Sequence, residues 1–409
     1  MLRWIVFLII YVVLGLYTLQ ALKTITRHPW VYYTFMAIAI LVLGNFIYQF
    51  TLGETPGRVL SRSKSYAFGF LITLIVFESV TIIFLFSEDI IRLISAAYSK
   101  FFGTSKEFTF PERRKFLSTI ALGLASIPFG ALLYGMYRGK YNFKVLKYTL
   151  EFDDLPETFD GYRITQISDV HSGSFDNREK IEYAVGLINQ QKSDVLLFTG
   201  DMVNNMATEM EPWASLFSTL EAKDGKYSIL GNHDYGDYVE WETQEAKEKN
   251  LEDLKKLQKD IGFDLLLNES RFLQKGKDRI ALVGVENWGK GGFKKAGDLA
   301  KAAEKISKDD FKILMSHDPT HWEEKVLSDD YHYHLTLSGH THGMQFGIEI
   351  PGWVKWSPSK WRYKHWAGIY NEQGEYLNVN RGFGFLGYPG RVGIWPEITV
   401  ITLKKKSVV

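Results

Sequence analysis

The stretch that decides the fold is ITQISDVHSGS, residues 164–174, in which an apolar run ends in Asp169-Val170-His171. Four further runs have the same form, with polar side chains directly after an apolar segment. They are DVLLFTGDMVN (194–204), KYSILGNHDYG (226–236), KILMSHDP (312–319) and YHLTLSGHTHG (333–343). Short apolar runs bounded by glycine and polar residues predict buried β-strands. Glycine permits the sharp turns and positive φ that such strand exits require.

The pattern around these runs predicts an α/β fold from about residue 144 onward. Strands are expected at 163–168, 195–199, 227–230, 279–285, 312–316, 334–338 and 398–403, and helices at 178–191, 209–222, 244–261 and 296–306. In folds where strands alternate with helices, ligands gather at the carboxyl ends of the strands. The polar residues of the five runs stand at those ends, so we expect them to converge on one site.

The histidine and cysteine counts limit the chemistry of that site. The chain has ten histidines and no cysteine, which excludes disulfides, thiolate zinc sites and cysteine nucleophiles. Five of the ten histidines stand at the strand exits. Each motif alone is weak, but five of them in this order are not explained by chance. Any metal must be held by His, Asp, Glu or Asn, a ligand set that suits Mn, Fe or Zn.

The net charge is +1, from 48 basic and 47 acidic residues, with no basic stripe. Nucleic acid is therefore not expected as a partner.

The first third of the chain carries four apolar runs, near 4–22, 29–53, 65–87 and 116–137. Each is long enough to cross a bilayer, which takes about 20 residues, and helices satisfy the backbone groups in lipid. The first run is longer than a signal-peptide core, which favours an uncleaved helix. We expect a transmembrane region over 1–137, a linker over 138–158 and a globular domain over 159–409.

Two features of the third run have alternative interpretations. Glu78, a carboxylate at membrane depth, is by default a functional candidate. The simpler interpretation is a protonated side chain hydrogen-bonded to a neighbouring helix, since the other three runs carry no charge. The segment DIIRLISAAYSKFF, residues 89–102, either lies along the membrane surface or continues the third helix.

The orientation in the membrane depends on one local motif, because lysines and arginines are equally numerous on both sides. The residues RRKFL, 113–117, stand directly before the fourth run and resemble a twin-arginine export signal. They favour a multi-pass cell-membrane protein whose globular domain is extracytoplasmic. A chance cluster would leave that domain inside, and this alternative stays open.

The ligand set suits chemistry on phosphate esters, whose negative charge repels an attacking hydroxide. Two metal ions about 3.5–4 Å apart lower the pKa of a bound water, hold the phosphate oxygens and neutralise charge in the transition state. A bridging carboxylate keeps two cations that close, and Asp201 is the natural candidate.

The series D-x-H, GD-x-x-N, GNH-D, an isolated His and GH-x-H is similar to the calcineurin-like metallophosphoesterase superfamily. The segments LPETFDGYRITQISDVH (155–171) and NRGFGFLGYPGRVGIWPEITVITL (380–403) resemble its bacterial membrane-associated phosphodiesterase branch, often exported by a twin-arginine route. The resemblance implies that 159–409 is a catalytic domain, a four-layer αββα sandwich preceded by an all-α region of about four transmembrane helices.

The resemblance also implies roles for single residues. His233 would protonate the leaving oxygen or stabilise charge on the phosphate. Asp234 is a candidate to orient His233. One departure is Met344, where the branch usually has glycine. The implied metal ligands are Asp169, His171 and His342 for one ion, Asn232, His317 and His340 for the other, and Asp201 as the bridge.

The expected function is hydrolysis of phosphodiester or pyrophosphate bonds by metal-activated hydroxide, with two divalent or trivalent ions (Mn, Fe or Zn). Membrane lipid and a phosphoester substrate are the expected partners. Lipid-linked substrates are favoured because the linker is short and four helices exceed what tethering requires. The tryptophans of 353–366 form either a lipid-facing lip or core. One alternative is a cytoplasmic-facing nucleotide-sugar-lipid pyrophosphatase of envelope synthesis. The other is a membrane sensor or transport module with a regulatory phosphoesterase domain.

Overall fold

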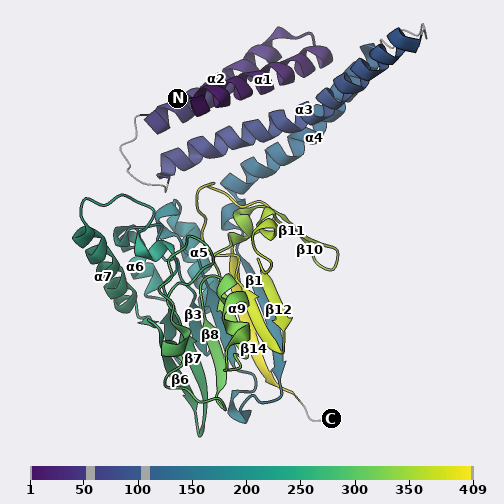
Figure 1. Ribbon diagram of the computed structural model, residues 1–409. Coiled ribbons are helices and arrows are strands. Elements are labelled where there is room, and N and C mark those ends of the chain that lie inside the picture. Colours follow the sequence, from purple (N-terminus) through teal and green to yellow (C-terminus); the bar gives the residue numbers. More distant parts are fainter. Residues whose placement is uncertain (1, 52–59, 103–110, 407–409) are drawn as a thin grey trace. The chain divides into compact units, whose positions relative to one another are not determined.

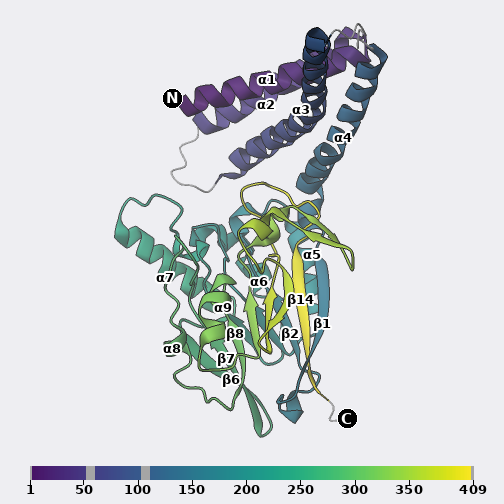
Figure 2. The ribbon, with the colours of Figure 1, turned by 45° about the vertical axis from the view of Figure 1, so that its right-hand side comes forward.

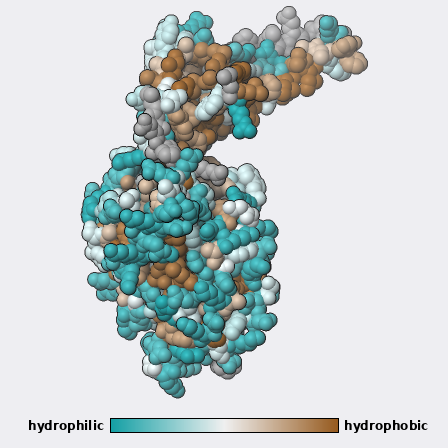
Figure 3. Space-filling view, turned by 60° about the vertical axis from the view of Figure 1, so that its left-hand side comes forward, coloured by the Kyte–Doolittle hydropathy of each residue, from teal (hydrophilic) through white to brown (hydrophobic). Residues whose placement is uncertain are grey.

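Four long apolar helices form the N-terminal unit, which extends to Tyr137. They are α1 (Leu2–Ile25), α2 (Pro29–Thr51), α3 (Arg62–Phe102) and α4 (Pro111–Tyr137). All four are long and apolar enough to cross a membrane, and Figure 3 shows the apolar side chains gathered over this unit. The computed structural model describes residues 2–51, 60–102 and 111–406 (Figure 1). The expected all-helical region is confirmed; the end of its second predicted helix, residues 52 and 53, lies outside the described residues.

The structure of the third helix bears on both features that have alternative interpretations in the sequence. It runs without a break through Phe102, so the segment 89–102 continues the helix. Glu78 is 0% exposed and lies against α1, where a Cβ on Gly15 would be 3.5 Å from Glu78 Oε1. Among the described residues, neither carboxylate oxygen of Glu78 has a hydrogen-bond partner. The expected hydrogen bond to a neighbouring helix is therefore not formed.

Two six-stranded sheets form the second unit, which continues from Arg138. The first has the order β1-β14-β2-β3-β4-β5, with β1 (Lys144–Phe152), β2 (Arg163–Ile167), β3 (Val195–Phe198), β4 (Lys226–Ser228), β5 (Asp264–Leu265) and β14 (Glu397–Lys405). The second has the order β12-β13-β9-β8-β7-β6, with β6 (Glu269–Lys275), β7 (Asp278–Gly284), β8 (Phe311–Met315), β9 (Leu335–Ser338), β12 (Gly368–Glu372) and β13 (Glu375–Val379). A separate hairpin pairs β10 (Ile348–Ile350) with β11 (Val354–Trp356).

Helices cover the outer faces of both sheets (Figure 1, Figure 2). The first sheet packs against α5 (Arg178–Asn189), α6 (Glu211–Phe217) and α7 (Gln244–Asp260), and the second against α8 (Leu299–Ala302) and α9 (Thr320–Glu324). Alternate residues of one strand face opposite sides. In β3, Val195 and Leu197 lie in the core between the sheets, whereas Leu196 and Phe198 pack against the helices. The expected four-layer αββα sandwich is thereby confirmed.

The expected linker over 138–158 contains a strand of the first sheet. Strand β1 pairs in parallel with β14 along its whole length, from Lys144 opposite Glu397 to Phe152 opposite Lys405. The α/β unit also begins to pack earlier than residue 159. A Cβ on Gly139 would overlap the carbonyl oxygen of Arg391 and lie 2.9 Å from the Trp395 ring.

Candidate metal centre

The seven candidate ligands come from five strand exits that meet at one edge of the sandwich. Strands β2, β3 and β4 run parallel in the first sheet, and β8 and β9 run parallel in the second, so their carboxyl ends lie together. Asp169 and His171 follow β2, Asp201 follows β3, Asn232 follows β4, His317 follows β8, and His340 and His342 follow β9. The expected convergence on one site is what the structure shows.

The backbone turns sharply at five of the ligands. Asp169, His171, Asp201, His340 and His342 have φ values of 52°, 46°, 59°, 71° and 49°. The left-handed region costs a residue with a Cβ about 1–2 kcal/mol. Strain that is concentrated at one site persists only where the surrounding fold enforces it, and it marks functional positions.

Asp169, His171 and His342 form a buried cluster whose ligand atoms lie within 4.8 Å of one another. His342 Nε2 is 3.0 Å from His171 Nε2 and 3.2 Å from Asp169 Oδ1. Burial holds the pKa of His171 well below its usual value, so its ring is neutral, the form that binds metal. Although burial opposes it, His342 holds the pKa of Asp169 below its usual range, which keeps the carboxylate ionised.

Asp201, His317 and His340 form a second cluster of the same size. His317 Nδ1 donates to the Thr199 carbonyl at 2.7 Å. Although burial opposes it, the Asp201 carboxylate raises the pKa of His317 to about 10. Its Nε2 is buried and forms an ion pair with Asp201 Oδ2 at 3.1 Å. Asn232 joins this cluster, since its Oδ1 lies 2.7 Å from His340 Nδ1. A buried ring nitrogen and a carboxylate oxygen this close together offer two ligand atoms to one cation.

Asp201 borders both clusters. Its Oδ2 lies 3.1 Å from His317 Nε2 and 3.7 Å from His171 Nε2. Its Oδ1 accepts the backbone N–H of His233 at 2.8 Å. Burial opposes ionisation, yet the surrounding histidines hold the pKa of Asp201 well below its usual value. An ionised oxygen shared by two sets of imidazole and carboxylate donors fits a pair of metal ions.

His233 lies beside the ligands without joining either cluster. The centroid of its ring is 4.9 Å from that of His171. Its Nδ1 donates to the Asn204 carbonyl at 2.8 Å, which fixes the ring orientation and the tautomer.

Asp234 does not orient His233 as expected. Its carboxylate accepts the backbone N–H groups of Gly231, Asp201 and Met202, at 2.8, 2.9 and 2.8 Å. Three converging N–H donors outcompete one ring nitrogen for the carboxylate, and Asn204 takes that ring nitrogen instead. Asp234 thus ties together the two loops that carry Asp201 and Asn232. Burial raises the pKa of Asp234 to about 7.

Two residues that orient His340 were missed from the sequence. The Nε2 of His340 lies 3.2 Å from Asp318 Oδ2 and 2.9 Å from the Tyr363 hydroxyl. With Nε2 held in this way, Nδ1 faces Asn232 and the second cluster. Asp318 directly follows His317, so the sequence carried a signal for it. Tyr363 lies outside the strand-exit motifs and had none.

Two further side chains support the ligands. Asn232 Nδ2 donates to the Tyr238 hydroxyl at 2.8 Å, which turns Oδ1 toward His340. Arg391 is fully buried, and its Nη2 lies 3.2 Å from His342 Nδ1. Burial lowers the pKa of Arg391 to about 9.

The four histidines of the α/β unit outside the motifs have other partners. Those partners are Ser316 for His321, Glu375 for His332, Asp154 for His334, and both Glu323 and Glu372 for His365. Met344, the departure from the family pattern, is 46% exposed.

Family models and known proteins match this chain along most of its length. The family model "Calcineurin-like phosphoesterase" matches residues 162–344, and "Probable Calcineurin-like phosphoesterase, transmembrane domain" matches residues 2–140. The uncharacterized metallophosphoesterase YkuE of Bacillus subtilis is 30% identical over 304 residues, 72% of this chain and 98% of that protein. An uncharacterized metallophosphoesterase of Aquifex aeolicus is 28% identical over 284 residues, 68% of this chain and 99% of its own length. A "Transmembrane protein with metallophosphoesterase domain" of Danio rerio is 26% identical over 281 residues, 67% of this chain and 60% of that protein. The chain belongs to the calcineurin-like metallophosphoesterase family and is a membrane-associated, metal-dependent phosphoester hydrolase.

Proposed function

We propose that this hydrolase cleaves phosphodiester or pyrophosphate bonds in lipid-linked substrates, at a dimetal centre bridged by Asp201. The observation that carries the proposal is the position of Asp201 Oδ2 between His317 Nε2 at 3.1 Å and His171 Nε2 at 3.7 Å. A single ionised oxygen that borders two ligand clusters is what a pair of closely spaced cations requires.

The residues divide into two half-sites around that oxygen. The ions, when bound, supply a water of lowered pKa and positive charge for the phosphate oxygens. The nitrogen and oxygen ligands suit Mn, Fe or Zn. One half-site is Asp169, His171 and His342, the other is Asn232, His317 and His340, and Asp201 is common to both.

His233 is proposed to transfer a proton to the leaving oxygen. Because Nδ1 is committed to the Asn204 carbonyl, Nε2 is the atom available for the transfer. Burial lowers the pKa of His233, so the ring is neutral in the free protein. An anionic phosphate beside the ring favours its protonated form, which then gives its proton to the leaving group.

The lipid-linked substrate class is supported by the covalent arrangement of the chain. Helix α4 ends at Tyr137, and only Arg138 separates it from Gly139, which is packed in the α/β unit. A catalytic unit tethered this tightly to a membrane-spanning helix meets phosphoesters of the bilayer surface at high local concentration.

The activity test uses the full chain purified in detergent, loaded with Mn and assayed on bis-nitrophenyl phosphate. Asp201→Ala removes the shared ligand and should abolish both turnover and stoichiometric metal binding. His233→Ala should retain both metals and lose turnover. If both variants stay fully active, the measured turnover does not come from this site, and the catalytic roles proposed for Asp201 and His233 fail. A screen of lipid phosphates and lipid pyrophosphates then identifies the bond that is cleaved.

The proposed extracytoplasmic position of the catalytic unit rests on the residues RRKFL, 113–117. A reporter that is active only outside the cytoplasm, fused after the last residue, should give signal. A silent reporter, together with an active cytoplasmic reporter at the same position, favours the nucleotide-sugar-lipid pyrophosphatase alternative.

A further inference from the structure

The segment 350–371 has an unusual composition for the surface of an enzyme. It contains four tryptophans, three lysines and one arginine, and it has no aspartate or glutamate. The tryptophans divide between two environments: Trp366 is buried at 4% exposure, whereas Trp353 and Trp361 are 79% and 76% exposed. Part of the segment is therefore core, and part of it presents large aromatic side chains to solvent.

The exposed tryptophans belong to a larger apolar surface. The β10–β11 hairpin adds Ile348 and Ile350, which are 52% and 43% exposed. The basic residues Lys355, Lys360 and Arg362 are exposed along the same stretch. Exposed tryptophan beside lysine and arginine is typical of protein surfaces that sit at the boundary between lipid headgroups and acyl chains.

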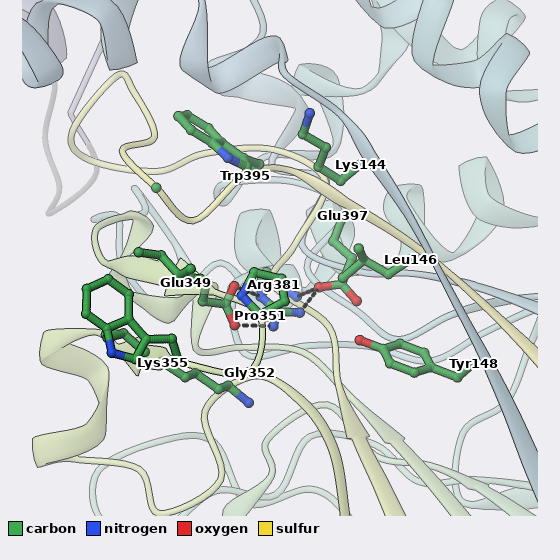
Figure 4. A pocket seen from close by; sticks show the side chains of 14 residues that line it. Lys144, Leu146, Tyr148, Glu349, Pro351, Gly352, Lys355, Arg381, Trp395 and Glu397 are labelled. Atoms are coloured by element: carbon green, nitrogen blue, oxygen red, sulfur yellow. Dashed lines mark hydrogen bonds and ion pairs between the residues drawn. The ribbon is translucent and has the colours of Figure 1, made fainter.

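A cavity of about 600 Å³ opens beside the hairpin (Figure 4). Its centre is Arg381, which is 7% exposed and pairs with Glu349 at 2.6 Å and Glu397 at 2.5 Å. The single positive charge of Arg381 balances one of the two negative charges. Lys144 and Lys355 line the same cavity and add positive charge. In the described part of the chain, no carboxylate forms an ion pair with either lysine.

The walls of the cavity are largely apolar. They include Leu146, Ile350, Trp353 and Trp395. Figure 4 shows Trp395 and Lys144 on one side of Arg381, and Lys355 and Tyr148 on the other. A cavity with apolar walls and a net positive lining fits an amphiphile with an anionic headgroup.

Segment 350–371 is also hydrogen-bonded to the loop that carries His340 and His342. The hydroxyl of Tyr363 lies 2.9 Å from His340 Nε2. Thr341 Oγ1 donates to the Trp366 carbonyl at 2.6 Å, and Ser357 Oγ donates to the Gly343 carbonyl at 2.6 Å. Whatever binds the exposed side of this segment is held at a fixed position relative to the metal centre.

We propose that the β10–β11 hairpin and the segment through Arg362 dock on an anionic phospholipid surface, and that the adjoining cavity takes one anionic phospholipid. The membrane is the occupant that the chain itself favours, because Trp395 lines the cavity and packs against Gly139, two residues after the last residue of α4. Each basic residue near an anionic surface contributes about 1 kcal/mol, or about fivefold in a binding equilibrium. The docking is independent of the proposed hydrolysis. A docked surface would also bring lipid phosphoesters close to the metal centre. This consequence, unlike the docking itself, rests on the proposed hydrolase function.

The absence of cysteine makes a direct test available. Ile348→Cys introduces a single thiol on the hairpin, and a nitroxide attached there reports its surroundings in the full chain reconstituted in nanodiscs. Oxygen concentrates in the bilayer and a nickel chelate stays in water, so their relative collision rates with the nitroxide measure depth. The matched control is Tyr183→Cys on α5, where the native side chain is 59% exposed.

In nanodiscs containing phosphatidylglycerol, the label at 348 should be reached by oxygen and shielded from nickel, and the label at 183 should be reached by nickel. In phosphatidylcholine nanodiscs the label at 348 should become more exposed to nickel. Equal nickel exposure at both positions in phosphatidylglycerol would overturn the proposal.

A charge variant tests the headgroup contribution without altering the label. Lys360→Gln should lower the ratio of docked to undocked protein about fivefold in phosphatidylglycerol. Lys249→Gln, an exposed lysine on α7, should leave the ratio unchanged. Equal effects of the two substitutions would show a general charge effect and would refute a specific docking surface. Hydrolysis of bis-nitrophenyl phosphate, measured in parallel, separates a failure of docking from a failure of the catalytic proposal.

Discussion

Gly231→Ala would place a methyl group against the carboxylate that the two half-sites share. A Cβ on Gly231 would lie 2.6 Å from the backbone nitrogen of Asp201 and 2.8 Å from its Cγ, and closer still to its Oδ1. Ordinary contact begins at 3.4 Å, so the backbone of Asp201 must retreat by about 0.8 Å. That shift exceeds the tolerance of about 0.5 Å within which a catalytic constellation keeps its geometry.

The expected result is a loss of both metal binding and turnover, because Asp201 serves both half-sites. Misplacement on the order of 1 Å costs about 100-fold in rate, which corresponds to about 2.7 kcal/mol of transition-state stabilisation. Elemental analysis of the purified variant gives the metal content, and kcat/KM for bis-nitrophenyl phosphate gives the rate. Overpacking should also destabilise the fold by about 1–3 kcal/mol, which thermal unfolding detects.

Gly186→Ala on α5 is the matched control, since nothing lies within 4 Å of a Cβ at that position. It should leave metal content and kcat/KM unchanged and stabilise the helix by up to about 1 kcal/mol. The reasoning fails if Gly231→Ala keeps two metals and a kcat/KM within about twofold of the unmodified chain.

Three further predictions follow from other contacts. His233→Ala should lower kcat by about 10²–10⁴-fold with both metals retained, and a parallel loss of metal would contradict its role in proton transfer. Asp318→Asn removes the negative charge that orients His340, so a metal titration should show about 10–100-fold weaker binding at the second half-site. Tyr363→Phe removes a neutral hydroxyl from the same ring nitrogen and should weaken metal binding less. Burial raises the pKa of Glu375 to about 7 from 4.5, so the folded state holds a proton more tightly than the unfolded state. The stability from this group is present below about pH 4.5 and is lost as pH rises through 7. Glu375→Gln should therefore be more stable than the unmodified chain at pH 8, on the order of 2 kcal/mol in urea unfolding, and equal midpoints at pH 8 would contradict this.

The strand exits were predictable because their signal is local. An apolar run of fixed length, a glycine and a polar residue are adjacent in sequence, and the common direction of parallel strands brings their ends together. Strand β1 lacked such a signal. Its apolar residues alternate with charged ones beside the end of a membrane helix, and its partner β14 lies at the far end of the chain. Long-range pairing of this kind leaves no trace in a short window of sequence.

The role of Asp234 shows that a contact between distant residues can also be hidden within a motif. Its position directly after His233 suggests a local interaction, yet its carboxylate serves the loop after a different strand. Tyr363 and Arg391 reach the site from the C-terminal segments, so only the closed fold reveals them. Asp318 was accessible from its position beside His317.

The alternation of side chains along β3 also bears on which length changes the chain can tolerate. Val195 and Leu197 face one core while Leu196 and Phe198 face another, and Asp201 follows three residues after Phe198. Insertion or deletion of one residue within the strand would exchange the two faces and rotate the Asp201 carboxylate out of the candidate site. Relatives that hydrolyse phosphoesters should therefore keep the spacing from strand to ligand fixed at all five exits. Their length differences should fall in surface segments that connect elements without setting any register and without contacting a candidate ligand.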